Sequence, residues 1–207
     1  YQVPATAMKG MCLVVSPLIA LMKDQVERLN DIGIPATCLV SGMHYNDVVR
    51  TLQEAANGSY KLLYVSPERL KTELFRDYLV EFDLSLLAVD EAHCISQWGH
   101  DFRPAYLEIA AVREVHPRVP VLALTASATA RVGDDIAASL KMKQPAMFRS
   151  SFARPNIFYR VLHTDDKTNV LLRNIGDECS IVYCRSRILT EKLGQYLSHE
   201  GIGATVY

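Results

Sequence analysis

Two carboxylates and an imidazole directly follow one apolar run of the sequence. The run is Leu86–Val89, and Asp90, Glu91 and His93 come immediately after it. In an enzyme that hydrolyses a nucleotide, one carboxylate at such a place holds Mg²⁺, usually through its waters, and the other orients or deprotonates the attacking water. The simpler interpretation is a helix cap with a solvated glutamate and a surface histidine. Because Asp-Glu pairs are common, these residues alone do not decide between the two.

The segment that follows is rich in rings and polar side chains. It contains the only tryptophan of the chain, and its candidate residues are Gln97, Trp98, His100, Phe102 and Arg103. A lone aromatic residue in a loop is more often a packing anchor. Two aromatic rings with an arginine and a histidine, directly after the carboxylates, are better suited to stacking on unpaired bases while sensing a nucleotide site.

The rest of the chain must supply the elements that position these residues. Short continuous apolar runs alternate with stretches of helical periodicity, which predicts an α/β fold whose parallel sheet is buried on both faces. The predicted strands are 11–15, 37–40, 62–65, 86–89 and 121–124.

Three start signals predict helices between these strands. Ser16-Pro17 and Ser66-Pro67 each offer an N-cap serine and a proline at the first helical position. A further helix is predicted after Pro104, with Leu107 among the residues that face the sheet.

Polar residues end each predicted strand. The endings are Ser16-Pro17, Ser41-Gly42, Ser66-Pro67-Glu68, Asp90-Glu91 and Thr125-Ala126-Ser127. Any one of them is better explained as a cap for the next helix. Because ligands of open α/β sheets bind outside the carboxyl ends of the strands, the five together favour a functional site at that edge.

A second unit is predicted to begin near the polar stretch 150–156. The expected order after it is strand, helix, strand, helix, strand, with strands at 157–159, 181–184 and 204–207 and a helix at 189–197. These elements are too few to close a domain. We therefore expect one domain at 1–150 and the start of another at 151–207.

Composition narrows the class of protein. The chain has 207 residues, 49% of them apolar, and 22 basic against 23 acidic side chains give a net charge of −1. These values exclude a disordered tail, a collagen-like fibre and a membrane protein. Near-neutral charge means that any nucleic-acid contact must be local. Five scattered cysteines without a C-x-x-C pair indicate a reducing compartment, and a zinc site from His93, Cys94 and His100 is disfavoured.

Residues 89–106 resemble motif II and the aromatic-rich loop of RecQ-type DNA helicases, within helicase superfamily 2. The resemblance covers nearly the whole chain. Segment 1–5 is similar to the residues just after that family's phosphate-binding loop. Motifs Ia, Ib, III and IV resemble 14–25, 64–70, 123–129 and 182–187.

The resemblance implies a 3′→5′ DNA motor of recombination and repair, with two RecA-like lobes around ATP and Mg²⁺. On the matching positions, Asp90 would hold the metal and Glu91 would activate water. His93 would couple that site to motif III through Ser127 and Thr129. The expected partner is DNA, as a single strand and at a duplex junction, with no membrane and with protein partners left unidentified. The expected location is the bacterial cytoplasm at the nucleoid, or the nucleus in a eukaryote.

The resemblance also implies which residues meet DNA. The aromatic loop, with Gln97, Trp98, His100, Phe102 and Arg103, would link DNA occupancy to hydrolysis. The residues implied along the path of the bound DNA strand are Ser16, Lys23, Ser66, Glu68, Arg69, Trp98, Phe102, Arg185 and Ser186. Without the resemblance, Lys23 and Arg185 would be taken as solvated surface charges.

The sequence departs from the family pattern in one decisive place. None of its ten glycines precedes a lysine, so the phosphate-binding loop G-x-x-x-x-G-K-[ST] is lacking. We expect that loop before Tyr1 and motifs V and VI beyond Tyr207, which makes the chain an internal fragment that is catalytically silent alone. Two alternatives stay open: a nucleic-acid-binding or regulatory module without motor activity, and an RNA-directed helicase, which the loop 97–100 disfavours.

Overall fold

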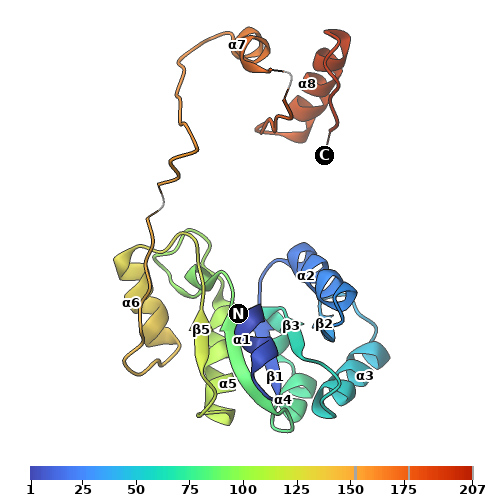
Figure 1. Ribbon diagram of the computed structural model, residues 1–207, viewed down its shortest axis with the longest axis vertical. Helices are drawn as coiled ribbons and strands as arrows, with labels where there is room; N and C mark the ends of the chain where they lie inside the picture. Colours follow the sequence, from blue (N-terminus) through green and yellow to red (C-terminus); the bar gives the residue numbers. More distant parts are fainter. Residues whose placement is uncertain (152, 177, 207) are drawn as a thin grey trace. The chain divides into compact units, whose positions relative to one another are not determined.

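The computed structural model describes residues 1–151, 153–176 and 178–206. The chain forms two compact units, 1–148 and 149–207, which are described separately (Figure 1). Among the described residues, no helix has the length and apolar character needed to cross a membrane.

The first unit contains a five-stranded parallel sheet. The strands are β1 (Met11–Val15), β2 (Ala36–Leu39), β3 (Leu62–Val65), β4 (Leu84–Val89) and β5 (Val121–Ala123), in the spatial order β2-β3-β1-β4-β5. All neighbouring pairs are parallel. The five predicted strands are therefore confirmed within one or two residues at their ends, and their carboxyl ends lie on one edge.

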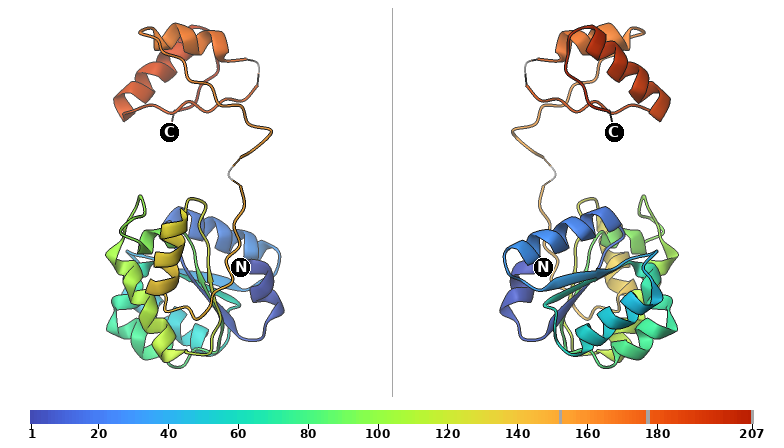
Figure 2. Two further views of the ribbon diagram at one scale, coloured as in Figure 1. Left: turned by 90° about the vertical axis from the view of Figure 1, so that its left-hand side faces the viewer. Right: turned by 90° about the vertical axis from the view of Figure 1, so that its right-hand side faces the viewer.

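Helices cover both faces of this sheet (Figure 2). Helices α1 (Gln2–Ala7) and α2 (Ile19–Asp31) pack on one face, where Cys12, Val14 and Tyr64 point. The opposite face carries the helices α3 (Tyr45–Ala56), α4 (Glu73–Leu79), α5 (Ile109–Val115) and α6 (Ala130–Ser139). Strand side chains alternate between the two cores because successive residues of a strand point to opposite faces.

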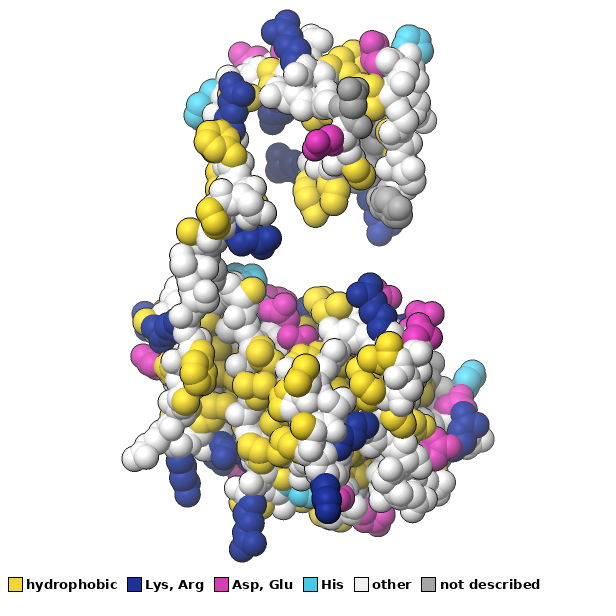
Figure 3. All heavy atoms as spheres, viewed as in Figure 1, with side chains coloured by type: hydrophobic (Ala, Val, Ile, Leu, Met, Phe, Trp, Pro, Cys, Tyr) yellow, Lys and Arg dark blue, Asp and Glu magenta, His cyan; other side chains and the backbone are white. Residues whose placement is uncertain are grey.

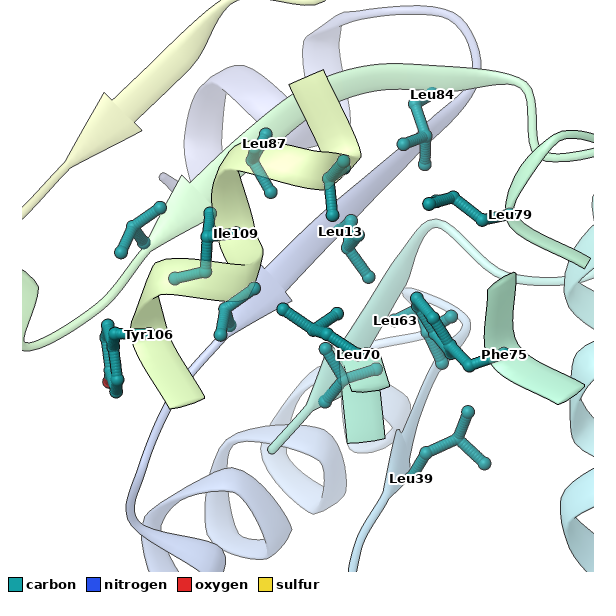
Figure 4. Close-up of a cluster of buried hydrophobic side chains, with 14 of the residues drawn as sticks. Leu13, Leu39, Leu63, Leu70, Phe75, Leu79, Leu84, Leu87, Tyr106 and Ile109 are labelled. Atoms are coloured by element: carbon teal, nitrogen blue, oxygen red, sulfur yellow. The ribbon is translucent and has the colours of Figure 1, made fainter. Parts of the chain in front are cut away.

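The larger core lies on the face of α3 to α6. Figure 4 shows Leu13, Leu63 and Leu87 of three adjacent strands pointing toward Phe75 of α4 and Ile109 of α5. All five side chains are buried. This packing fixes the central strands, and so fixes the positions of the residues that follow them.

Three short 3-10 helices stand where longer helices or loops are predicted. They are η1 (Pro67–Lys71), η2 (Ala92–Ile95) and η3 (Pro104–Glu108). The prediction that Leu107 faces the sheet is wrong, because the tighter turn of η3 leaves that side chain 48% exposed.

The predicted Ser16 cap of the second helix is also wrong. Helix α2 begins at Ile19 with Leu18 as its N-cap residue. Ser16 is 2% exposed, and its hydroxyl donates to a carboxylate at the end of β4 instead.

The described residues of the second unit form two helices, α7 (Lys167–Asn174) and α8 (Arg187–His199). The predicted helix 189–197 is confirmed as part of α8. The predicted strands 157–159, 181–184 and 204–206 are wrong, since these described residues pair with no neighbour; Tyr207, the end of the last one, lies outside the described residues. A strand needs a hydrogen-bonded partner, and apolar side chains of these segments are exposed. Figure 3 shows hydrophobic side chains in yellow on the surface of the second unit.

Candidate active site

Asp90 is held by contacts from three neighbouring segments. Its backbone N–H donates to the Val15 carbonyl at 2.9 Å, which continues the β1–β4 ladder by one residue. The Ser16 hydroxyl donates to Oδ2 at 3.2 Å, and the Glu91 N–H donates to Oδ1 at 3.1 Å. The buried Tyr106 hydroxyl donates to the Asp90 carbonyl at 2.9 Å. The carboxylate is therefore fixed at the sheet edge with both oxygens accepting hydrogen bonds.

Glu91 adopts a left-handed backbone conformation, with φ of 46° and ψ of 45°. This turn ends the strand and aims its carboxylate back at His93, whose Nδ1 lies 3.2 Å from the Glu91 Oε2. The same Nδ1 lies 3.0 Å from the Thr125 hydroxyl oxygen. Glutamate, imidazole and hydroxyl thus form a connected polar group that joins β4 to the segment after β5.

His93 is buried, with 5% of its surface exposed. Burial lowers the pKa of its imidazole, and the neighbouring His100 lowers it further, while the Glu91 carboxylate acts in the opposite direction. The neutral ring is therefore favoured at neutral pH. Both oxygen partners lie at Nδ1, so a neutral ring that carries its proton on this nitrogen donates toward the Glu91 carboxylate and the Thr125 hydroxyl oxygen.

The aromatic loop packs directly against this histidine. His100 stacks on His93 with 4.1 Å between ring centroids and 18° between ring planes. A Cβ at Gly99 would lie 2.3 Å from the His93 carbonyl oxygen, so only glycine fits there without a shift. The backbone N–H of Trp98 donates to the hydroxyl oxygen of the fully buried Ser96. The loop backbone and the catalytic candidates consequently form one packed unit.

The outer part of the loop is stabilised by two arginines. Arg103 forms hydrogen bonds to Asp101 through two nitrogens, at 3.1 and 3.0 Å. The guanidinium carbon of Arg131, in the first turn of α6, lies 3.4 Å from the Trp98 ring centroid. Trp98 itself remains 62% exposed, while Phe102 is half-buried and Gln97 is exposed.

Cys94 lies behind the loop. Its Sγ is 3.7 Å from the His93 Nε2, and burial raises the pKa of the thiol to about 11, with the Asp101 carboxylate adding to the shift. Such a thiol stays protonated and acts as a packing group. Among the described residues, no group of three or more His, Cys, Asp and Glu side chains is placed to hold a metal ion.

Ser127 and Thr129 lie on the segment between β5 and α6. The Ser127 N–H donates to the Thr125 hydroxyl oxygen at 3.3 Å, and the Thr129 hydroxyl caps α6 by accepting from the Val132 N–H. The direct partner of His93 is Thr125, so the sequence-based roles of Ser127 and Thr129 become indirect in this geometry.

The residues of the first unit that are predicted to line the bound DNA strand fall into two environments. Ser16 and Ser66 are buried, while Lys23 and Glu68 are exposed. The half-buried Arg69 donates from Nη2 to the Val40 carbonyl at 2.7 Å, which ties η1 to the end of β2. Ser16 therefore stands at the Asp90 carboxylate, and Arg69 uses one of its five donors structurally.

Arg185 and Ser186 lie in the second unit, before α8. The Ser186 hydroxyl accepts from the Leu189 N–H and caps that helix, and Arg185 is exposed.

The oxygen donors at Asp90 fit Mg²⁺. This ion takes one or two protein carboxylates and fills its remaining positions with waters and substrate phosphates, instead of using an all-protein cage. A carboxylate and a serine hydroxyl beside each other at the sheet edge offer that donor set, and Glu91 follows as a second carboxylate.

Sequence reasoning missed two members of this site. Thr125 lies within a strand ending and within the segment that resembles motif III, but its contact with His93 depends on the β4–β5 register, in which Val89 pairs with Ala123. Arg131 has no sequence signal, since a lone arginine in a helix is typical of a solvated face.

Known proteins resemble this chain in sequence. The sequence model of a family described as DEAD/DEAH box helicase matches residues 1–136. The chain is 39% identical to the ATP-dependent DNA helicase RecQ of Pasteurella multocida, over all of this chain and 33% of that protein. It is 42% identical to the ATP-dependent DNA helicase Q-like 4B of Arabidopsis thaliana, over all of this chain and 19% of that protein. The chain thus spans about a third or less of these relatives.

Solved structures share the fold at lower sequence identity. The Mycobacterium smegmatis helicase Lhr, bound to ssDNA and AMP-PNP, matches with a TM-score of 0.60 and 18% identity, over 95% of this chain and 29% of that one. At this identity the likeness shows the fold alone.

Proposed function

We propose, on the premise that this chain belongs to the DEAD/DEAH box helicase family and is of the RecQ type, that it is the interior of an ATP-dependent DNA helicase. The proposed motor translocates 3′→5′ and serves recombination and repair. Residues 1–150 are assigned to the first RecA-like lobe and 151–207 to the start of the second. The proposed location is the bacterial nucleoid, or the nucleus in a eukaryote.

The observation that carries this proposal is the polar group at the end of β4. Asp90 is fixed with its carboxylate at the sheet edge, and the next residue, Glu91, is linked through His93 to Thr125. Asp90, with Ser16 beside it, would hold Mg²⁺ through its waters. When bound with ATP, Mg²⁺ would neutralise charge that develops on the phosphates.

Glu91 is proposed to orient the attacking water. Its carboxylate is half-exposed, so one oxygen can accept from water while Oε2 faces His93. His93 then holds the carboxylate in place and connects it to Thr125 on the segment that leads into α6. A displacement of that segment changes the position of Glu91, which is how a mechanical motor can gate hydrolysis.

The aromatic loop is proposed to report DNA occupancy to this group. His100 stacks on His93, and the exposed Trp98 ring offers a face to an unpaired base. Lys23, Ser66, Glu68 and Arg69 are proposed to line the strand path of the first lobe, and Arg185 and Ser186 that of the second. Because net charge is −1, affinity for DNA must come from these few residues.

The test is Glu91→Gln in the full-length protein, which keeps the shape of the side chain and removes its charge. DNA-stimulated ATP hydrolysis is expected to fall by about 10² or more, since general-base catalysis contributes about 10²–10⁴. Lys23→Gln serves as a comparison variant on the proposed path of the DNA strand, and it should weaken DNA affinity and preserve the maximal rate. Unchanged hydrolysis in Glu91→Gln would contradict the role of Glu91.

The 207-residue chain alone is proposed to be inactive, because it lacks a phosphate-binding loop sequence and the arginine of the last family motif, and such an arginine is worth about 10³–10⁵ in rate. ATP turnover by the purified chain that Asp90→Ala abolishes would contradict this. DNA binding without any turnover by the full-length protein would favour a regulatory module instead.

A further inference from the structure

The Arg131 guanidinium lies over the only tryptophan of the chain, 3.4 Å from the ring centroid. Arg131 belongs to the first turn of α6, and Trp98 to the aromatic loop, 33 positions earlier in the sequence. A guanidinium at this distance interacts favourably with the electron-rich face of an indole. The contact therefore joins two segments that the backbone does not connect locally.

The Trp98 backbone is fixed independently of its ring. Its N–H is bound to the Ser96 hydroxyl, and Gly99 lies against the His93 carbonyl. The ring projects from this fixed backbone and remains 62% exposed. The Arg131 guanidinium lies against this ring, so it can favour one orientation of the indole.

The first turn of α6 is itself tied to the hydrolysis candidates. Thr125 contacts His93, Ser127 donates to Thr125, and Thr129 caps α6 two residues before Arg131. A movement of the Thr125 segment is thereby transmitted to Arg131 over six residues.

We propose that Arg131 is a positioning residue that orients the Trp98 ring for an unpaired base and couples that ring to the Thr125 segment. The proposal rests on the proposed function, and it adds a second connection between the nucleotide and DNA sites beside the His93–His100 stack. The guanidinium covers one face of the indole, and the base takes the exposed part of the ring. Arg131 acts through Trp98, and its own contact with DNA is not required.

The test compares Arg131→Ala with Arg118→Ala in the full-length protein. Arg118 is exposed in the segment before β5, at the amino ends of the strands, whereas the site lies at their carboxyl ends. Its replacement therefore removes the same charge at a place away from the site. Arg131→Ala is expected to raise the Kd for a single-stranded oligothymidylate about two- to five-fold, the range of an exposed cation–π contact. The DNA concentration for half-maximal ATPase stimulation should rise equally. An Arg131→Ala variant equal to Arg118→Ala would overturn the proposal, and so would tighter DNA binding, which would mean that Arg131 blocks the ring.

Two further comparisons separate positioning from a phosphate contact. Arg131→Lys keeps the charge and loses the planar stack, so it should resemble Arg131→Ala. Full rescue by lysine, or a decrease of about 0.7 in the slope of log Kd against log salt concentration for Arg131→Ala, would identify a phosphate ligand and overturn the proposal. In a Trp98→Ala background, Arg131→Ala should add no further effect; an additive effect would also overturn it.

The ring contact can be measured directly, since Trp98 is the only tryptophan of the chain. Arg131→Ala should increase quenching of the chain's intrinsic fluorescence by acrylamide, and unchanged quenching would overturn the proposal. Failure of the proposed function gives a different pattern: Trp98→Ala alone would then leave DNA affinity and ATPase stimulation unchanged. If Trp98→Ala weakens both and Arg131→Ala weakens neither, the positioning role alone fails.

Discussion

The two units of the chain contain similar apolar runs with opposite structural outcomes. In the first unit, Leu62–Val65 is a fully buried strand between two parallel neighbours. In the second unit, the run 181–184 forms no strand, with Ile181 79% exposed and Tyr183 91% exposed. Helices form in both units.

The difference shows which elements can form from their own segment of the chain and which need distant segments. A helix satisfies its backbone hydrogen bonds within its own segment, and the Ser186 side chain caps α8 from the adjacent residue. A strand depends on segments that are distant in the sequence, and its apolar side chains need helices above and below the sheet. The first unit supplies these neighbours, and the described part of the second does not.

The largest expected effect concerns the buried strands. Leu63→Ala removes a fully buried side chain from the core of the first unit and should lower the free energy of unfolding by about 2–5 kcal/mol. Ile181→Ala, in the second unit, should change it by less than about 0.5 kcal/mol. Urea denaturation of both variants measures this. Similar losses would mean that the second unit buries Ile181 in solution.

Thiol reactivity should separate the units next. Burial raises the pKa of Cys12 to about 12 and that of Cys94 to about 11, so at pH 8 the thiolate fraction of Cys94 is about 10⁻³. Cys179 in the second unit is exposed. A thiol reagent at pH 8 should therefore modify Cys179 at least about a hundredfold faster than Cys94, as followed by peptide mass spectrometry. Equal rates would indicate that the first unit opens readily.

A glycine pair gives the smallest effect. Gly99→Ala brings a Cβ to 2.3 Å from the His93 carbonyl oxygen and should destabilise the first unit by about 1–3 kcal/mol, because the backbone itself must shift. Gly176→Ala, in the second unit, meets nothing within 4 Å and should be neutral within about 0.5 kcal/mol. Thermal denaturation compares the two, and a neutral Gly99→Ala would show that the loop is not packed against His93.

Much of the first unit could be predicted from the sequence. The five strands were predictable because continuous apolar runs of four or five residues are typical of parallel strands buried on both faces. The helix boundaries were less so: Ser16 has the residue type of a cap, and only the fold brings Asp90 within reach of its hydroxyl. In the second unit the helix 189–197 was predicted correctly, and the strands were predicted wrongly because a strand-like composition does not supply a partner.

The sequence predicted most residues of the candidate site, but it did not predict the contacts between them. Asp90, Glu91 and His93 are adjacent in sequence, so their shared position followed from one strand. The contacts with Thr125 and Arg131 depend on the β4–β5 register and on the course of the chain into α6. Such distant pairings leave no local pattern in a single sequence.

The left-handed backbone of Glu91 has a consequence for engineering this protein. A residue with a side chain loses about 1–2 kcal/mol in that conformation, and glycine would not. A laboratory selection for heat resistance alone would favour glycine at position 91 wherever this gain exceeds the loss of the Glu91–His93 contact, and it would discard the carboxylate. Variants recovered from such a selection need an activity screen before position 91 is accepted as improved.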